Sequence, residues 1–242
     1  MNDRRVPPAP SSARVWLTLL LCWVVGINLR TVILGVPPVL PLIQHDLRLS
    51  NTLIGLLSSL PVLCMGVLAI PAARLAARLG GRVAVALGLG LLAAGAFLRA
   101  VPATALAVFG FTLVLSIGIT IAQTTLPVLV RQWFPERIGL ASAVYSNGLV
   151  IGETLAVAVT GPVFLRGFGA DAWPATFLLW SLPVALVLGC WLVFAPPAPP
   201  LGFAAAPTAS ASAPGEIPAT GVRAETPLPA WHLGLLLGSG SL

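Results

Sequence analysis

The chain has 242 residues, of which 57% are hydrophobic and only 8% are charged. A soluble domain of this length needs far more polar surface, so the composition excludes a soluble globular protein and indicates an integral membrane protein. The net charge of +6 does not indicate nucleic-acid binding, because all 13 basic residues are arginines in short clusters between long apolar runs, without interleaved aromatic residues.

Six apolar stretches have the length of about 20 residues that a membrane-spanning helix requires. The first is too long for the apolar part of a secretory signal and has no small-residue cleavage site, so it predicts a retained helix. A seventh stretch begins near Trp231 and is too short to cross a bilayer, so the chain looks cut within a seventh helix. The six predicted spans are residues 15–40, 53–73, 83–98, 103–130, 139–165 and 173–194.

The arginines predict the orientation in the membrane. If the N-terminus is cytoplasmic, only Arg48, Arg99 and Arg166 lie outside, and Arg30 lies within the first span. Cytoplasmic loops carry the excess of arginine and lysine, so we expect the N-terminus and the segment after the sixth span inside, in an inner or plasma membrane. The arginines then placed inside are Arg4, Arg5, Arg14, Arg74, Arg78, Arg82, Arg131, Arg137 and Arg223.

Composition divides the chain into four parts. Residues 1–14 form a cytoplasmic tail and residues 15–195 a six-helix bundle. Residues 196–229 contain many prolines and alanines and few charges, which is typical of a flexible or partly polyproline linker. Residues 230–242 begin the seventh helix.

Within the third span, Ala86, Gly90 and Ala94 are four residues apart and so share one helix face, which predicts close helix packing. The three cysteines lie in apolar spans without metal-ligand spacing, and we expect neither a metal site nor a cofactor.

Four strings carry a family resemblance. They are "GINLR" in the first span, "PPVLPLIQHDLRLS" after it, "LSSLPVLCMG" in the second span and "RQWFPERIGLASAVY" after the fourth. Together with six helices, a long loop and a further helix start, they resemble the cyanate and 2-nitroimidazole transporter branch of the major facilitator superfamily. Its transporters consist of two six-helix halves related as parallel repeats.

The resemblance implies an all-α membrane protein, the six-helix N-terminal half of a major facilitator fold plus the start of a seventh helix. It implies a secondary carrier that moves a small solute, a cyanate-like anion or a small nitroaromatic compound, by alternating access. Its partners would be that solute, membrane lipid and the missing C-terminal half, or a second copy of this half. Two alternatives stay open: a structural or receptor-like membrane protein, and an intramembrane hydrolase, although the six spans contain no histidine.

The loop after the second span departs from the superfamily signature. Aligned on Gly80, the signature aspartate falls on Ala77, and the acidic residue is absent. The resemblance implies a gating role for Arg74, Arg78 and Arg82. The other interpretation is that these arginines only set topology and meet lipid phosphates.

Arg30 and Glu153 are the two charges inside the six spans, apart from the span ends. At about 1.5 Å per residue, both lie roughly 21–23 Å from the cytoplasmic ends of their helices, which run in the same direction. An unpaired charge at this depth is costly, so we predict that they face one polar interior. Arg30 would bind the substrate or pair with Glu153, which would exchange a proton; the alternative is a structural salt bridge.

Further polar residues are candidates for the same substrate cavity. Gln123 and Asn147 lie at matching depths, about seven and eight residues from the inner ends of their helices, and could share a hydrogen bond. The alternative is that each amide only links adjacent helices. The cavity candidates are Asn28, Thr31, Gln123, Tyr145 and Asn147.

Overall fold

The computed structural model of the protein describes residues 12–101, 104–165, 167 and 173–197. The chain divides into the units Met1–Phe203 and Ala204–Leu242, and the fold described below belongs to the first. Most of the predicted linker at 196–229, the predicted helix start at 230–242 and Arg223 lie outside the described residues, as does most of the N-terminal tail. Those predictions therefore stay predictions.

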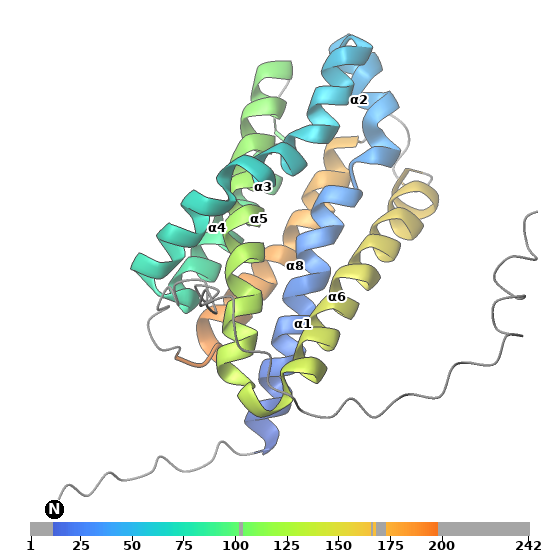
Figure 1. Ribbon diagram of the computed structural model, residues 1–242. Coiled ribbons are helices and arrows are strands. Elements are labelled where there is room, and N and C mark those ends of the chain that lie inside the picture. The colour runs from blue at the N-terminus through green and yellow to red at the C-terminus, as the bar shows by residue number, and fades with distance from the viewer. Residues whose placement is uncertain (1–11, 102–103, 166, 168–172, 198–242) are drawn as a thin grey trace, which may run out of the picture. The chain divides into compact units, whose positions relative to one another are not determined.

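The described part is all-helical, with six helices long and apolar enough to cross a membrane (Figure 1). This confirms the predicted number of spans and the all-α class. The elements in chain order are α1 (Ser12–Leu34), η1 (Pro37–Val39), α2 (Leu40–Leu47), α3 (Asn51–Leu79), α4 (Gly81–Leu98), α5 (Ala105–Trp133), η2 (Pro135–Arg137), α6 (Ile138–Val159), the π-helix η3 (Thr160–Leu165) and α8 (Trp173–Phe194).

The first predicted span, 15–40, lies within the candidate span Ala13–Leu47, but it is not one continuous helix, because α1 ends at Leu34 and the chain turns before α2. Pro37 and Pro38 have no backbone N–H to continue the helical hydrogen bonds. At Gly35 the chain passes close to α8, since a Cβ there would lie 2.8 Å from Trp180 Nε1. Figure 1 shows α2 at the end of the bundle opposite the start of α1.

Other boundaries follow local chemistry. The α3 helix begins after Ser50, whose hydroxyl accepts a hydrogen bond from the Leu53 N–H, and it continues through two prolines to Gly80. Gly80 has a φ of +83°, which favours glycine and turns the chain sharply into α4. The fifth predicted span continues beyond α6 as the π-helix, which contains Pro162.

The α4 and α5 helices pack closely through glycines. A Cβ on Gly88 would lie 2.7 Å from the Gly118 carbonyl oxygen and 2.9 Å from the Ala122 nitrogen. The predicted packing face of this helix is confirmed only in part: Ala86 packs against the core and a Cβ on Gly90 would face Leu188 of α8 at 4.0 Å, whereas Ala94 is exposed. Small residues do mediate the contact, on the neighbouring face of the helix.

The α1 and α6 helices form a second close pair (Figure 1). Gly148 faces the Trp23 carbonyl and Gly152 faces the Ile27 carbonyl, with no room at either position for a Cβ. Backbones at this distance bring the side chains of the following turns into contact. The approach of Gly152 to α1 thereby places its neighbour Glu153 beside the C-terminal half of α1.

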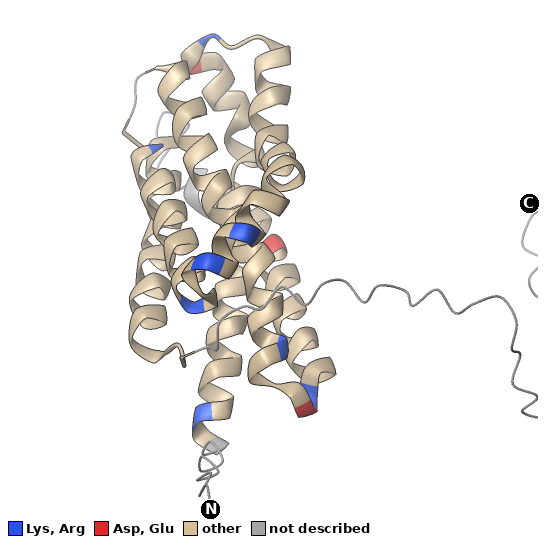
Figure 2. Cartoon of the chain, turned by 60° about the vertical axis from the view of Figure 1, so that its left-hand side comes forward, with Lys and Arg blue, Asp and Glu red and all other residues tan. Residues whose placement is uncertain are grey.

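The outer surface of the bundle is apolar. On α3, Val67 is 75% exposed and Ile70 is 64% exposed, and Figure 2 shows how sparse charged residues are along the helices. A surface of this kind is stable against lipid chains or another apolar helix, whereas water would disfavour it. With six spans of this composition, the chain is a multi-pass membrane protein.

Candidate functional site

The structure brings Arg30 of α1 and Glu153 of α6 together. Arg30 Nε lies 3.3 Å from Glu153 Oε1, so the pairing predicted from the helix depths is present. The Nε–H makes no hydrogen bond within the described residues, so the contact with Glu153 is an ion pair. The two side chains are 28% and 40% exposed, so both charges are only partly covered by the described residues.

Four of the predicted polar neighbours, Asn28, Thr31, Tyr145 and Asn147, lie on the same pair of helices. The Asn28 amide donates to the Val24 carbonyl, 2.9 Å away on its own helix, and Asn28 is buried. The Thr31 hydroxyl donates to the Asn28 carbonyl at 3.2 Å. The Tyr145 hydroxyl is also buried and has no hydrogen-bond partner among the described residues. The Tyr145 hydroxyl thus has unused hydrogen-bonding capacity.

The proposed hydrogen bond between Gln123 and Asn147 is wrong. Asn147 Oδ1 instead accepts from the Trp23 indole N–H at 3.1 Å, which links α6 to α1. Gln123 Oε1 is buried without a partner in the described part of the chain. Equal depth in the membrane therefore did not bring these two side chains into a hydrogen bond.

The three arginines of the predicted gate differ in their surroundings. Arg74 and Arg78 are exposed at the C-terminal end of α3. Arg82 Nη2 donates to the Leu192 carbonyl at 2.7 Å, and the Trp191 indole donates to the Arg82 carbonyl at 3.0 Å. A cation at the last carbonyls of α8 is favourable for the helix dipole, so Arg82 fastens α4 to the end of α8.

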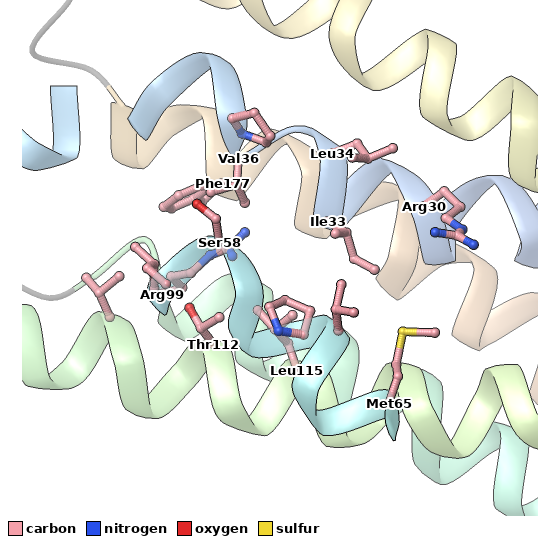
Figure 3. Close-up of a pocket in the computed structure, with 15 residues that line it drawn as sticks. Arg30, Ile33, Leu34, Val36, Ser58, Met65, Arg99, Thr112, Leu115 and Phe177 are labelled. Atoms are coloured by element: carbon pink, nitrogen blue, oxygen red, sulfur yellow. The ribbon is translucent and has the colours of Figure 1, made fainter. Parts of the chain in front are cut away.

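A cavity of about 180 Å³ lies between α1, α3, α5 and α8. Figure 3 shows Arg30 near one end of it and Arg99 near the other, with apolar side chains between them. Glu153, Gln123, Tyr145 and Asn147 do not line this cavity, whereas Arg30 does and also contacts Glu153. Its polar lining residues are Arg30, Ser58, Arg99 and Thr112.

Arg99 is the residue that the sequence analysis missed. The topology rule counts it as a loop charge, yet it is only 3% exposed and its Cζ lies 3.9 Å from the centre of the Phe177 ring. It follows directly after the α4 span, where burial lowers its pKa to about 9, so it stays charged at neutral pH. The available signal was the sequence "GAFLRAV", in which Arg99 has no polar neighbour.

Several known proteins are similar to this chain. A relative from Bacillus subtilis (strain 168), the uncharacterized transporter YycB, is 33% identical over 187 residues, which cover 76% of this chain and 46% of the relative. Two proteins of Escherichia coli (strain K12) are each 30% identical to this chain. The match to the cyanate transport protein CynX covers 72% of this chain and 44% of the relative. The match to the 2-nitroimidazole transporter covers 69% of this chain and 42% of the relative. The chain thus spans less than half the length of these curated relatives.

Among solved structures, a bacterial homologue of the human lysosomal transporter Spinster, in an inward-facing and unoccupied conformation, has a similar fold. The TM-score is 0.66 at 20% identity, with 79% of this chain and 45% of that chain covered. The described helices therefore have the arrangement of part of that transporter. Residues 17–241 also match the family description of the Major Facilitator Superfamily. The chain belongs to the Major Facilitator Superfamily and resembles its cyanate and 2-nitroimidazole transporter branch.

Proposed function

We propose that the chain is part of a secondary carrier that moves a small solute across a membrane by alternating access. The observation that carries this proposal is the Arg30–Glu153 pair, which combines opposite charges inside an apolar bundle with partial exposure of both side chains. Charges within a membrane are rare and mark solute or proton pathways. A structural or receptor-like role needs no such accessible pair.

The solute class follows from size and charge. Pockets for drug-sized ligands have volumes of about 300–1,000 Å³, and the cavity beside Arg30 is smaller, at about 180 Å³. Two arginines line it and no acidic residue does. We therefore propose a small anion as the substrate in preference to a neutral nitroaromatic compound, with Arg30 as its binding group and Glu153 as the group that exchanges a proton.

Uptake into proteoliposomes tests this function. With the full-length protein, we expect saturable uptake of radiolabelled cyanate that exceeds uptake of 2-nitroimidazole and rises when an inward proton gradient is imposed. Protein-free liposomes are the control for leakage. Absence of uptake for both solutes would contradict the carrier function, and uptake of 2-nitroimidazole alone would contradict the choice of an anion.

We further propose that the N-terminus is cytoplasmic and that the membrane is the inner or plasma membrane. The support is the arginine distribution, because the exposed Arg74, Arg78 and Arg137 then lie inside. The end of the bundle formed by α2 and by Arg99 would then be the outer end.

Cysteine labelling tests the orientation. In a background in which Cys22, Cys64 and Cys190 are replaced by alanine, His45→Cys on α2 should react with a membrane-impermeant maleimide in intact cells. Glu136→Cys, which is equally exposed but lies in η2, should react only after the membrane is permeabilised. The opposite pattern would show that the N-terminus is outside.

A further inference from the structure

Arg99 is a buried cation without a neutralising partner in the described part of the chain. It is 3% exposed, its Nε is buried, and neither a hydrogen bond nor an ion pair is formed by its guanidinium there. Phe177 supports the guanidinium from one face, with Cζ 3.9 Å from the ring centre. A cation–π contact orients the group but leaves its N–H donors unused.

None of the carboxylates of the described residues forms an ion pair with Arg99. Glu153 pairs with Arg30, and Asp46 accepts a hydrogen bond from the Trp173 indole at 2.8 Å. Glu136 belongs to η2, between α5 and α6, and so lies at the other end of the bundle from α2. A buried guanidinium without a partner is costly, and none of the described carboxylates pairs with Arg99, so a bound anion would stabilise it.

The surroundings of Arg99 offer such an anion a second donor and limited space. The Thr112 hydroxyl lines the same cavity, is buried and has no hydrogen-bond partner within the described residues. Figure 3 shows Thr112 and Ser58 near Arg99, while Arg30 lies at the far end of the cavity. The lining next to Arg99 is otherwise mostly apolar, and the charge of Arg30 at the far end is already balanced by Glu153, so the site favours a single negative charge.

We propose that Arg99 and Thr112 bind a small monovalent anion, of the size of nitrate or cyanate, at a site separate from the Arg30–Glu153 pair. This inference rests on the proposed carrier function and adds a second binding site for the same class of solute. A guanidinium binds a planar oxyanion through parallel N–H donors, and the Thr112 hydroxyl adds a third. The other cationic side chain that lines this cavity is Arg30, at the opposite end from the bound anion.

Nitrate binding to the purified full-length protein tests the site. Nitrate is titrated into detergent-solubilised protein by calorimetry, in a sodium gluconate background of constant ionic strength. Arg99→Gln should weaken nitrate binding by about tenfold or more, since charge-assisted hydrogen bonds are lost. Arg48→Gln, which removes an exposed arginine from the same end of the bundle, should leave binding unchanged. Equal nitrate affinity of Arg99→Gln and the wild type would overturn the proposal.

Two milder variants keep the test decisive if Arg99→Gln does not fold. Arg99→Lys retains the charge but loses the planar donor geometry, and Thr112→Val replaces only the hydroxyl; both should weaken nitrate binding. Wild-type affinity in both would refute the site. Nitrate binding is measured without transport, so the two proposals can fail separately. If the wild type takes up no solute but Arg99→Gln weakens nitrate binding, the carrier function is contradicted and this site is retained. If the wild type takes up solute but Arg99→Gln binds nitrate as tightly as the wild type, the carrier function is retained and this site is contradicted.

Discussion

Replacing either Arg30 or Glu153 should reduce solute uptake by the full-length protein to the level of protein-free liposomes. Arg30→Ala leaves Glu153 without its cation, and Glu153→Gln removes the carboxylate that lies 3.3 Å from Arg30 Nε. Hydrogen bonds from a bound solute or proton carrier to a charged group contribute about 1.5–3 kcal/mol, so each change should lower the initial uptake rate by at least about 10- to 100-fold, close to the background of protein-free liposomes. The measurement is uptake of labelled cyanate under an inward proton gradient.

Matched controls separate this effect from general damage. Arg137→Ala and Glu136→Gln make the same chemical changes at exposed positions of η2, and both variants should transport like the wild type. The double variant Arg30→Ala, Glu153→Ala distinguishes the two roles of the pair. If it regains transport, the pair is a structural salt bridge; if it stays inactive, the charges themselves act on the solute or the proton.

The Arg30–Glu153 pair could be predicted because an unpaired charge inside the membrane is costly, so two opposite charges at the same depth are expected to pair. Arg30 and Glu153 are the charges inside the spans, and helix rise places them at the same depth. Depth alone does not fix the direction in which a side chain points. For a charge in an apolar bundle, pairing fixes that direction, and the ion pair is present.

The same reasoning failed for Gln123 and Asn147, which also lie at one depth. A neutral amide costs less to bury and can bond to any nearby donor, as Asn147 does to the Trp23 indole. Arg99 was missed for a related reason. The topology rule assigns a loop arginine to a side of the membrane and does not report its burial, which arises from packing of Phe177 of α8 against it.

The number of spans was predictable because hydropathy over about 20 residues is a strong signal. The packing faces were not, since a helix that is apolar on all sides has no amphipathic pattern that points to its neighbours. On α4, small residues occur on more than one face, and the sequence does not indicate which one meets α5. In the structure Gly88 faces α5, whereas Gly90 does not. Comparing the stability of variants at these two positions tests this arrangement.

Gly88→Val should strongly destabilise the full-length protein, whereas Gly90→Val should not. The valine Cβ at position 88 would lie 2.7 Å from the Gly118 carbonyl oxygen and 2.9 Å from the Ala122 nitrogen, and backbone atoms cannot move aside without separating α4 from α5. Overpacking costs about 1–3 kcal/mol and more where backbone is met, which predicts a fall in the melting temperature of about 2–10 °C, or failure to fold.

Gly90→Val introduces the same β-branched residue two positions later in the same helix, so both variants carry the same change in helix propensity. A Cβ at position 90 would have Leu188 Cδ2 as its nearest neighbour at 4.0 Å, which is ordinary contact with the end of a side chain. Thermal unfolding in detergent, followed by tryptophan fluorescence, should therefore give a near wild-type melting temperature for this variant. If Gly90→Val is the more damaging of the two, α4 packs through the face of Ala86, Gly90 and Ala94, and the orientation of Arg99 beside Phe177 would have to change with it.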